Sequence, residues 1–292
     1  MPIQKAKIYK PAQFMHNVMD DTNVFLGIGG TVTEYESGGT VYRVHSFLSG
    51  TGAVRFTSSG TVDFLIVAGG GGSAAAEGNT GSTGGGGAGG MVVGTSQTIS
   101  SGNYTVVVGA GGAKSTDINA KSGDGGNSTL FGYTASGGAG GTDYVGSDSE
   151  YTGTTGGCGG GGSENAQTGG GTNQNTYSST AGVTGYGNAG GNGGPYGGAG
   201  SGGSGSGGGA GGAGNNANNG VSAGGIGLAN NFRTGSNVTY ATGGQGVAGN
   251  ENGVAGGANT GDGAGGVSSS GGGNTNGADG GSGIVVIRYA LN

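Results

Sequence analysis

Glycine constrains this chain more than any other residue type, because 86 of its 292 residues are glycine. A glycine loses more conformational freedom on folding than any other residue, and fixing one backbone unit costs about 1–2 kcal/mol. The enrichment is strongest over residues 139–283, where 55 glycines stand with few Val, Ile, Leu or Phe side chains. That segment cannot build a conventional apolar core. It is either a flexible linker or a structure held together by its backbone.

Two observations favour an ordered segment over a linker. Apolar runs precede and follow the segment, and part of it, from Gly202 to Ala213, reads in triplets. A three-residue period is that of the polyproline II conformation, which has no internal hydrogen bonds. Glycine chains in this conformation keep their N–H groups and can approach closely enough to bond laterally to one another. The sequence therefore predicts a bundle of polyglycine II-like helices over residues 136–283. Collagen is excluded, because the chain has only three prolines.

The rest of the chain has the two-residue period of β-strands, and no α-helix is expected. The predicted fold class is all-β, a β-sandwich that carries the glycine-rich bundle as a long insertion. The C-terminal run is too apolar to stay in solvent, so we expect it to pair with the earlier strands. The strand candidates are residues 41–48, 53–57, 61–68, 90–93, 95–99, 104–108, 129–135 and 283–290.

This reading divides the chain into three parts. Residues 1–40 are expected to be an attachment segment. Residues 41–135 and 284–292 are expected to form the sandwich, and residues 136–283 the glycine-rich bundle with binding loops.

Composition argues against several functions. The net charge is −6 and there is no basic stripe, so nucleic-acid binding is not expected. No apolar run is long enough for a membrane span. Cys158 has no partner cysteine, and no His, Ser and Asp arrangement or carboxylate pair can be argued around His16 and His45. We therefore expect no catalytic residue, no metal, no cofactor and no enzymatic activity.

Five blocks resemble, in the same order, the glycine-rich domain of tailed-phage virion proteins, which occurs in tail fibres, adhesins and other surface appendages. They are TVDFLIVAGGGG (61–72), GGGGAGGMVV (84–93), YTVVVGAGG (104–112), GNSTLFG (126–132) and GSGIVVIRY (281–289). The resemblance covers about residues 40–290. The insertion is also similar in style to the polyglycine sandwich of an adhesin at the fibre tips of some T-even-like phages. In that adhesin, loops at the distal end of the glycine helices contact the host.

The resemblance implies a non-enzymatic protein of the phage virion surface, expected to be a tail-fibre tip adhesin that recognises a host receptor. The alternatives are a purely structural virion protein, as a capsid decoration or fibre component, and a bacterial surface protein. Expected partners are other virion proteins, through residues 1–40, and a host surface glycan or outer-membrane protein; a homo-oligomer is left open.

Large side chains in the insertion are the candidate receptor contacts, since Tyr and Asn suit adaptable binding loops. The alternative is that these rings only cover the edges of the glycine bundle. For a fibre tip, Tyr144, Tyr151, Tyr177 and Phe232 should lie together or at one end of the bundle, away from residues 1–40. The candidates are Tyr144, Tyr151, Tyr177, Tyr186, Phe232, Arg233 and Tyr240.

Overall fold

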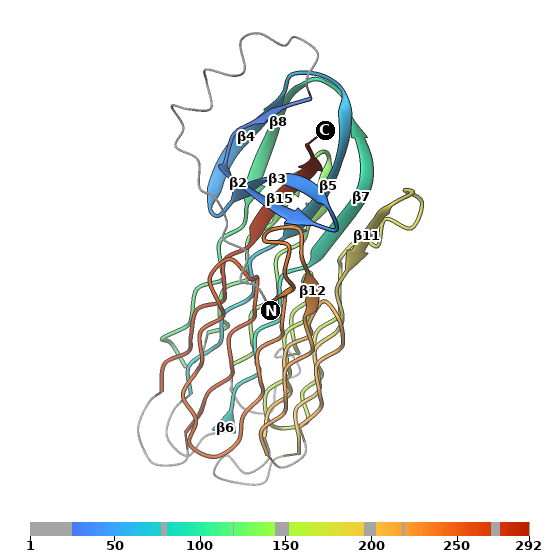
Figure 1. Cartoon of the computed structure of the whole chain (residues 1–292). Coiled ribbons are helices and arrows are strands. Elements are labelled where there is room, and N and C mark those ends of the chain that lie inside the picture. Colours follow the sequence, from blue (N-terminus) through green and yellow to red (C-terminus); the bar gives the residue numbers. More distant parts are fainter. Residues whose placement is uncertain are drawn as a thin grey trace.

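A computed structural model describes residues 25–76, 81–118, 120–143, 152–195, 203–217, 220–269 and 275–291. These residues form β-strands and extended segments with no helix, which confirms the all-β prediction. Figure 1 shows the longer strands gathered at one end and a long array of side-by-side extended segments at the other. The described part holds no helix with the length and apolar character that a bilayer crossing needs.

The strands follow one another in this order: β1 (Gly27–Ile28), β2 (Thr31–Ser37), β3 (Thr40–Phe47), β4 (Gly50–Phe56), β5 (Gly60–Val67), β6 (Gly81–Ser82), β7 (Met91–Ile99), β8 (Gly102–Val108), β9 (Ser128–Leu130), β10 (Tyr133–Ala135), β11 (Val183–Tyr186), β12 (Leu228–Asn230), β13 (Val238–Tyr240), β14 (Ser268–Ser269) and β15 (Ile284–Ala290).

Two antiparallel sheets form the sandwich. One has the order β1-β4-β8-β9-β10, and the other has the order β11-β7-β5-β15-β3-β2. The C-terminal strand β15 lies between β3 and β5, with Val286 opposite both Ser46 and Leu65. The predicted return of the C-terminal run to the earlier strands is therefore confirmed.

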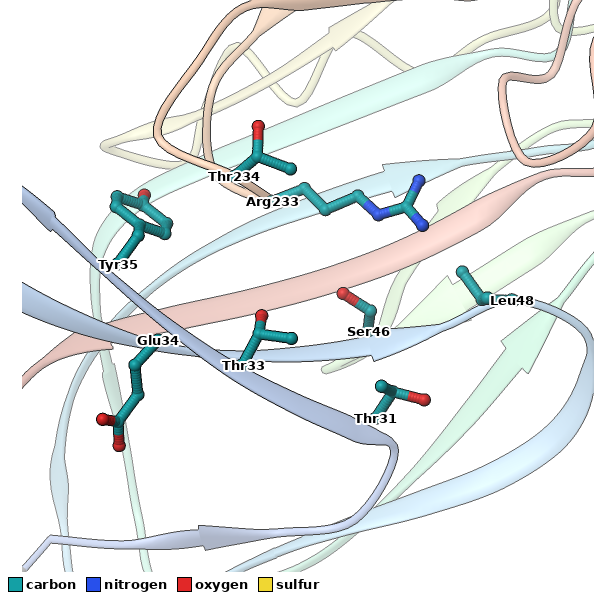
Figure 2. Close-up of a pocket in the computed structure, with 8 residues that line it drawn as sticks. All are labelled: Thr31, Thr33, Glu34, Tyr35, Ser46, Leu48, Arg233 and Thr234. Carbon is teal, nitrogen blue, oxygen red and sulfur yellow. The ribbon is translucent and has the colours of Figure 1, made fainter. Parts of the chain in front are cut away.

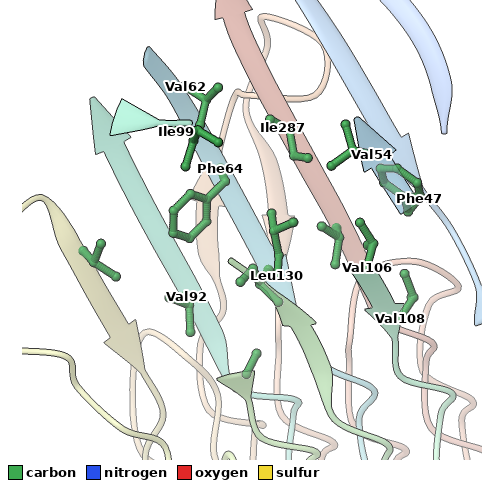
Figure 3. Close-up of a cluster of buried hydrophobic side chains, with 14 of the residues drawn as sticks. Phe47, Val54, Val62, Phe64, Val92, Ile99, Val106, Val108, Leu130 and Ile287 are labelled. Carbon is green, nitrogen blue, oxygen red and sulfur yellow. The ribbon is translucent and has the colours of Figure 1, made fainter. Parts of the chain in front are cut away.

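The main core lies between the two sheets (Figure 3). Phe56 and Val106 of the first sheet meet Phe64 and Ile287 of the second, and all four are almost fully buried. The opposite face of β5 and β15 is also buried, against Ala88, Cys158 and Ala210 of the glycine-rich part and the β12–β13 hairpin. Burial on both faces explains why these two strands read as continuous apolar runs.

The sandwich begins earlier than the sequence indicated. Strand β2 pairs along its whole length with β3, and β1 pairs with β4. The assignment of residues 1–40 to an attachment segment is therefore wrong for residues 27–37. Residues 1–24 lie outside the described part.

The glycine-rich array is likewise not one insertion. The connections from β5 to β7 and from β8 to β9 also run through it, and strand β11, from within residues 136–283, adds to the edge of the six-stranded sheet. The two parts of the molecule are therefore interleaved along the chain. The sequence missed this because short glycine runs between strands read as turns.

Lateral hydrogen bonds hold the array together, and their three-residue period is clearest in residues 84–90. Successive amides of this segment donate in turn to three neighbouring segments, with N···O distances of 2.8 to 3.2 Å. Gly84 and Gly87 donate to Thr142 and Ala139, Gly85 and Ala88 to Gly205 and Gly208, and Gly86 and Gly89 to Ala264 and Gly261.

The carbonyl groups of the same segment accept from three further segments. The donors are Ala68 and Gly71, Cys158 and Gly161, and Gly244. Six segments therefore surround residues 84–90, and every residue of the segment is buried. This arrangement confirms the predicted bundle of three-fold glycine helices and gives every amide and most carbonyls of the segment the partner that burial demands.

The close packing leaves no space for a side chain at many interior glycines. A Cβ atom added to Gly87 would overlap the carbonyl oxygen of Cys158, whose backbone is itself hydrogen-bonded in the array. Gly171 differs, because it is exposed and a Cβ there would meet only the Thr155 side chain, at 3.6 Å.

We expect Gly87→Ala to lower the free energy of unfolding by about 3 kcal/mol or more, since backbone must move apart to admit the methyl group. The matched control Gly171→Ala should change it by less than about 1 kcal/mol. Urea denaturation of both variants checks this. Equal small changes would contradict a close-packed array.

His45 is fully buried in the sandwich beside Tyr289. Its Nδ1 lies 2.7 Å from the carbonyl oxygen of Gly29, and its Nε2 lies 3.3 Å from the Tyr289 hydroxyl. The carbonyl contact requires a proton on Nδ1, so the neutral ring donates there. Burial lowers the pKa of His45 to about 4, from an ordinary value of 6.5.

The unfolded chain therefore binds a proton at His45 before the folded chain does. The resulting stability is present above pH 6.5 and is lost as the pH falls toward 4, by about 3 kcal/mol over that window. We expect His45→Gln to flatten the pH dependence of the unfolding free energy between pH 7 and 4. Thermal unfolding of both proteins across this range gives the measurement. Parallel curves would show that His45 does not titrate in this way.

Candidate functional site

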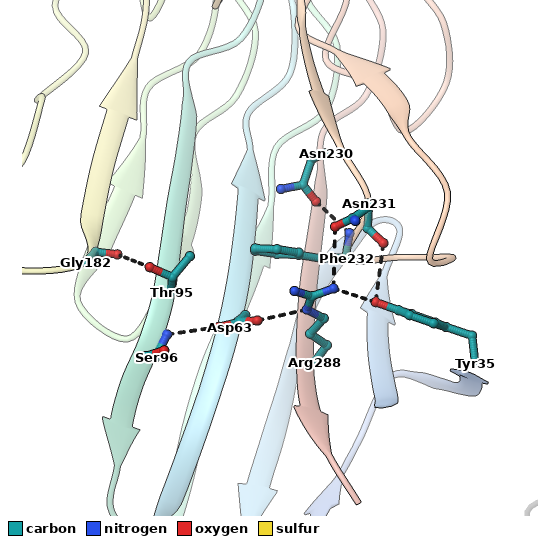
Figure 4. Close-up of polar contacts among 9 residues, drawn as sticks. All are labelled: Tyr35, Asp63, Thr95, Ser96, Gly182, Asn230, Asn231, Phe232 and Arg288. Carbon is teal, nitrogen blue, oxygen red and sulfur yellow. Dashed lines mark hydrogen bonds and ion pairs between the residues drawn. The ribbon is translucent and has the colours of Figure 1, made fainter. Parts of the chain in front are cut away.

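The β12–β13 hairpin leaves the glycine array and packs on the six-stranded sheet, with Arg288 of β15 beneath it (Figure 4). The Phe232 ring lies over the Arg288 guanidinium, with 4.0 Å from Cζ to the ring centroid, and Tyr42 contacts the same group at 4.6 Å. A guanidinium between aromatic faces gains cation–π stabilisation at both.

Asp63 fixes Arg288 from the neighbouring strand. The two residues stand directly opposite in the register of β5 and β15, and Arg288 Nε donates to Asp63 Oδ2 at 2.9 Å. The second carboxylate oxygen accepts from the Ser96 amide at 2.9 Å, where the pairing of β5 and β7 is irregular. The strand irregularity thus supplies the donor that holds the carboxylate in place.

Tyr35 completes the network. Its hydroxyl accepts from Arg288 Nη1 at 2.7 Å and lies 3.4 Å from the Asn231 carbonyl oxygen, to which it donates. Burial raises the pKa of Tyr35, although the Arg288 contact acts in the opposite direction. Burial disfavours the charge on Arg288, but hydrogen bonds to Tyr35 and Asp63 outweigh that effect and raise the pKa of its guanidinium.

The loop of the hairpin fits closely against Tyr35. Gly235 has φ of +79°, and a Cβ there would lie 2.8 Å from the Tyr35 ring. A side chain at this position would be strained and would press on the ring. Glycine therefore allows residues 231–237 to approach the sheet.

A pocket of about 260 Å³ opens beside this contact (Figure 2). Strand β2 provides one wall, the end of β3 provides the floor and the hairpin loop provides the other wall. The lining residues are Thr31, Thr33, Glu34, Tyr35, Ser46, Leu48, Arg233 and Thr234. Most of its exposed lining is apolar, and its polar side chains are hydroxyls, Glu34 and the Arg233 guanidinium, which can donate hydrogen bonds and attract an anion.

The structure brings together three of the residues predicted from the sequence, Phe232, Arg233 and Tyr240, on one hairpin. Phe232 and Tyr240 are buried in the cluster that joins the hairpin to the sheet, and Tyr240 has no exposed surface. Burial raises the pKa of Tyr240, with Arg233 acting in the opposite direction. Of the three, Arg233 alone lines the pocket.

Tyr177 and Tyr186 lie elsewhere. The Tyr177 ring meets Tyr133 edge-on, and its hydroxyl both donates to the Thr134 carbonyl at 2.9 Å and accepts from the Thr134 amide at 2.8 Å. It therefore satisfies the open edge of β10. Tyr186 pairs with Met91 at the edge of the other sheet and is half-buried. Tyr144 and Tyr151 lie outside the described residues.

Tyr177 and Phe232, the two described members of the expected group, therefore do not lie together. Phe232 and Tyr177 both pack at the sandwich end, in different clusters. Both rings are held by contacts with the sandwich, and they do not form a group of exposed side chains.

Two buried carboxyl groups, Asp143 and Glu164, occupy the glycine array. A Glu164 oxygen accepts from the Ser82 amide at 3.2 Å. Asp143 has no hydrogen-bond partner among the described residues, and burial raises the pKa of its carboxyl. Over the same residues, no group of three or more His, Cys, Asp or Glu side chains could hold a metal ion.

Sequence reasoning missed the residues that fix the hairpin, namely Asp63, Arg288 and Tyr35. A usable signal was present, because Asp63 and Arg288 are the charged residues within the two most apolar strands. A charge inside a buried strand needs a partner, and β5 and β15 supply one for each other.

The fold defines a class of protein in which a β-sandwich is continuous with a hydrogen-bonded array of glycine helices. The chain matches the model of a family described as a glycine-rich domain over residues 46–290, and it belongs to that family. No curated protein matches this sequence.

We expect Arg288→Met to destabilise the protein by about 2–3 kcal/mol, because it leaves Asp63 and the Tyr35 hydroxyl without their charged partner. Arg288→Lys should recover only part of this loss, since an ammonium group cannot reproduce the forked, stacked geometry. Urea denaturation measures both, with exposed Arg55→Met as the control. A loss no larger than that of the control would contradict the anchoring role.

Proposed function

We propose that this chain is a protein of the phage virion surface that acts as a tail-fibre tip adhesin and recognises a host cell-surface receptor. Membership of the glycine-rich domain family supports the proposal, together with the order of sequence blocks that resemble tailed-phage virion proteins. The observation that carries it is the buried, laterally hydrogen-bonded glycine array around residues 84–90. Such an array resists deformation and can hold attached loops in fixed positions.

Recognition then depends on the elements that leave this array. The β12–β13 hairpin is one, and its loop borders the pocket lined by Arg233 and Thr234. The turn that leads into β11 is another, and it projects from the side of the molecule in Figure 1. No enzymatic step is part of this proposal. Attachment to other virion proteins falls to the chain before β1, since β1 and β2 belong to the sandwich.

The alternative is a structural virion protein, in which the same surfaces contact other components of a capsid or fibre. The exposed apolar side chains Val221, Ile226 and Val254 favour this reading, because they lie on the outside of the array. A bacterial surface protein is the third candidate.

Cell binding separates these functions. We expect the fluorescently labelled full chain to bind some members of a panel of bacteria and to block adsorption of a phage that carries this protein, whereas heat-denatured chain should do neither. Antibodies against the chain should mark tail tips in electron micrographs. Labelling of the capsid or fibre shaft, without cell binding or inhibition, would contradict the adhesin proposal and favour the structural alternative.

A further inference from the structure

The pocket beneath the hairpin loop contains hydroxyl groups that are free to bind a ligand. Thr31 stands opposite Ser46 in the pairing of β2 and β3, and Thr33 lies two residues along the same strand face. Within the described residues, the side-chain hydroxyls of these three have no hydrogen-bond partner. Their positions follow from the sheet, with about 5 Å across the pair and about 7 Å along the strand.

The charge that remains for a ligand is positive. Glu34 is paired with Arg43, with N···O distances of 2.6 and 2.9 Å, and its carboxylate points away from the pocket in Figure 2. Arg233 reaches from the hairpin across the strands toward Ser46 and Leu48. The ion pairs among the described residues are Arg43–Glu34 and Arg288–Asp63. Within that part of the chain, no carboxylate therefore lies within 4.0 Å of the Arg233 guanidinium.

Arg233 lines the pocket, whereas its neighbour Phe232 is buried on Arg288. The Arg233 guanidinium also acts on the buried Tyr240 hydroxyl, against the burial that raises the pKa of that group. A guanidinium has several N–H donors in a planar fork, so it can still form two parallel hydrogen bonds with a carboxylate.

The size and shape of the pocket further limit the class of ligand that it can bind. A volume of about 260 Å³ is smaller than pockets for drug-sized molecules, which begin near 300 Å³. Leu48 and the Tyr35 ring add apolar surface to the lining. Phosphate or a simple carboxylate could reach Arg233, but could not span hydroxyls spread over about 5 by 7 Å. A sugar ring that carries a carboxylate can do both.

We propose that this pocket binds an acidic monosaccharide unit, with the carboxylate on Arg233 and the sugar hydroxyls on Thr31, Thr33 and Ser46. The inference rests on the proposed receptor-binding function and gives it a ligand class, an acidic surface glycan.

The test is titration of the full chain, followed by NMR, with glucuronate, galacturonate and N-acetylneuraminate. Glucose, galactose, acetate and phosphate are the comparison ligands. At least one acidic sugar should bind at least tenfold more tightly than every comparison ligand. Binding no tighter than the neutral sugars, or no tighter than acetate and phosphate, overturns the proposal.

Substitutions in the pocket test whether the acidic sugar binds there. Arg233→Gln should weaken acidic-sugar binding by at least tenfold, while Arg55→Gln, a matched change at an exposed arginine on β4, should leave it unchanged. Thr33→Val keeps the side-chain shape and should weaken binding several-fold through the lost hydroxyl. Equal affinities for Arg233→Gln and Arg55→Gln would overturn the assignment of the site.

Cell binding separates this inference from the proposed function. If the chain binds cells but no acidic sugar, the adhesin proposal stands and the pocket assignment fails. If an acidic sugar binds through Arg233 but no cell is bound, the pocket assignment stands and the adhesin proposal fails.

Discussion

The lateral hydrogen bond between glycine backbones is the interaction on which the rest of this structure depends. Each such bond contributes only about 0.5–1.5 kcal/mol net, which is close to the entropy cost of fixing one residue. The array is therefore stable only when nearly every backbone group finds a partner, and a partly formed array gains nothing. The six neighbours around residues 84–90 meet this condition, because all the amides and most of the carbonyls of the segment are used.

The sandwich makes this condition attainable by fixing where the segments begin. Strands β5, β7, β8, β9 and β15 continue directly into glycine segments, so their order in the sheets sets the order of segments in the array. Ser128 joins the two regions at the boundary, since its hydroxyl donates to the Val67 carbonyl at 2.8 Å and accepts from the Gly109 amide at 2.9 Å. A segment with its ends already placed loses less entropy on ordering than a free chain.

The sequence predicted the features that depend on local pattern. Dense apolar runs located β5 and β15, and the triplets after Gly202 indicated the three-fold helices. It could not show that residues 68–76, 81–90, 109–118 and 120–127 belong to the same array, because a glycine run has the same sequence pattern in a turn and in a lattice segment. For the candidate site, the sequence singled out Phe232 and Arg233 by composition, but not their opposite roles. Those roles arise from Arg288 and Asp63, which lie far away along the chain and become neighbours only through sheet register.

This division of roles has a consequence for how a glycine-rich protein can carry specificity. At the closely packed glycines of the array a side chain is excluded by backbone contacts, so large and varied side chains stand mainly on the elements that leave it. Such elements have no glycine neighbours to order them, and they need side-chain anchors of their own. The β12–β13 loop has two, the Phe232 stack on Arg288 and the close approach of Gly235 to Tyr35. These anchors use Phe232 and Gly235, and Arg233, which lies between them in the loop, lines the pocket. The six-stranded sheet, which also carries the glycine array, thereby gives a short loop the preorganisation that binding requires.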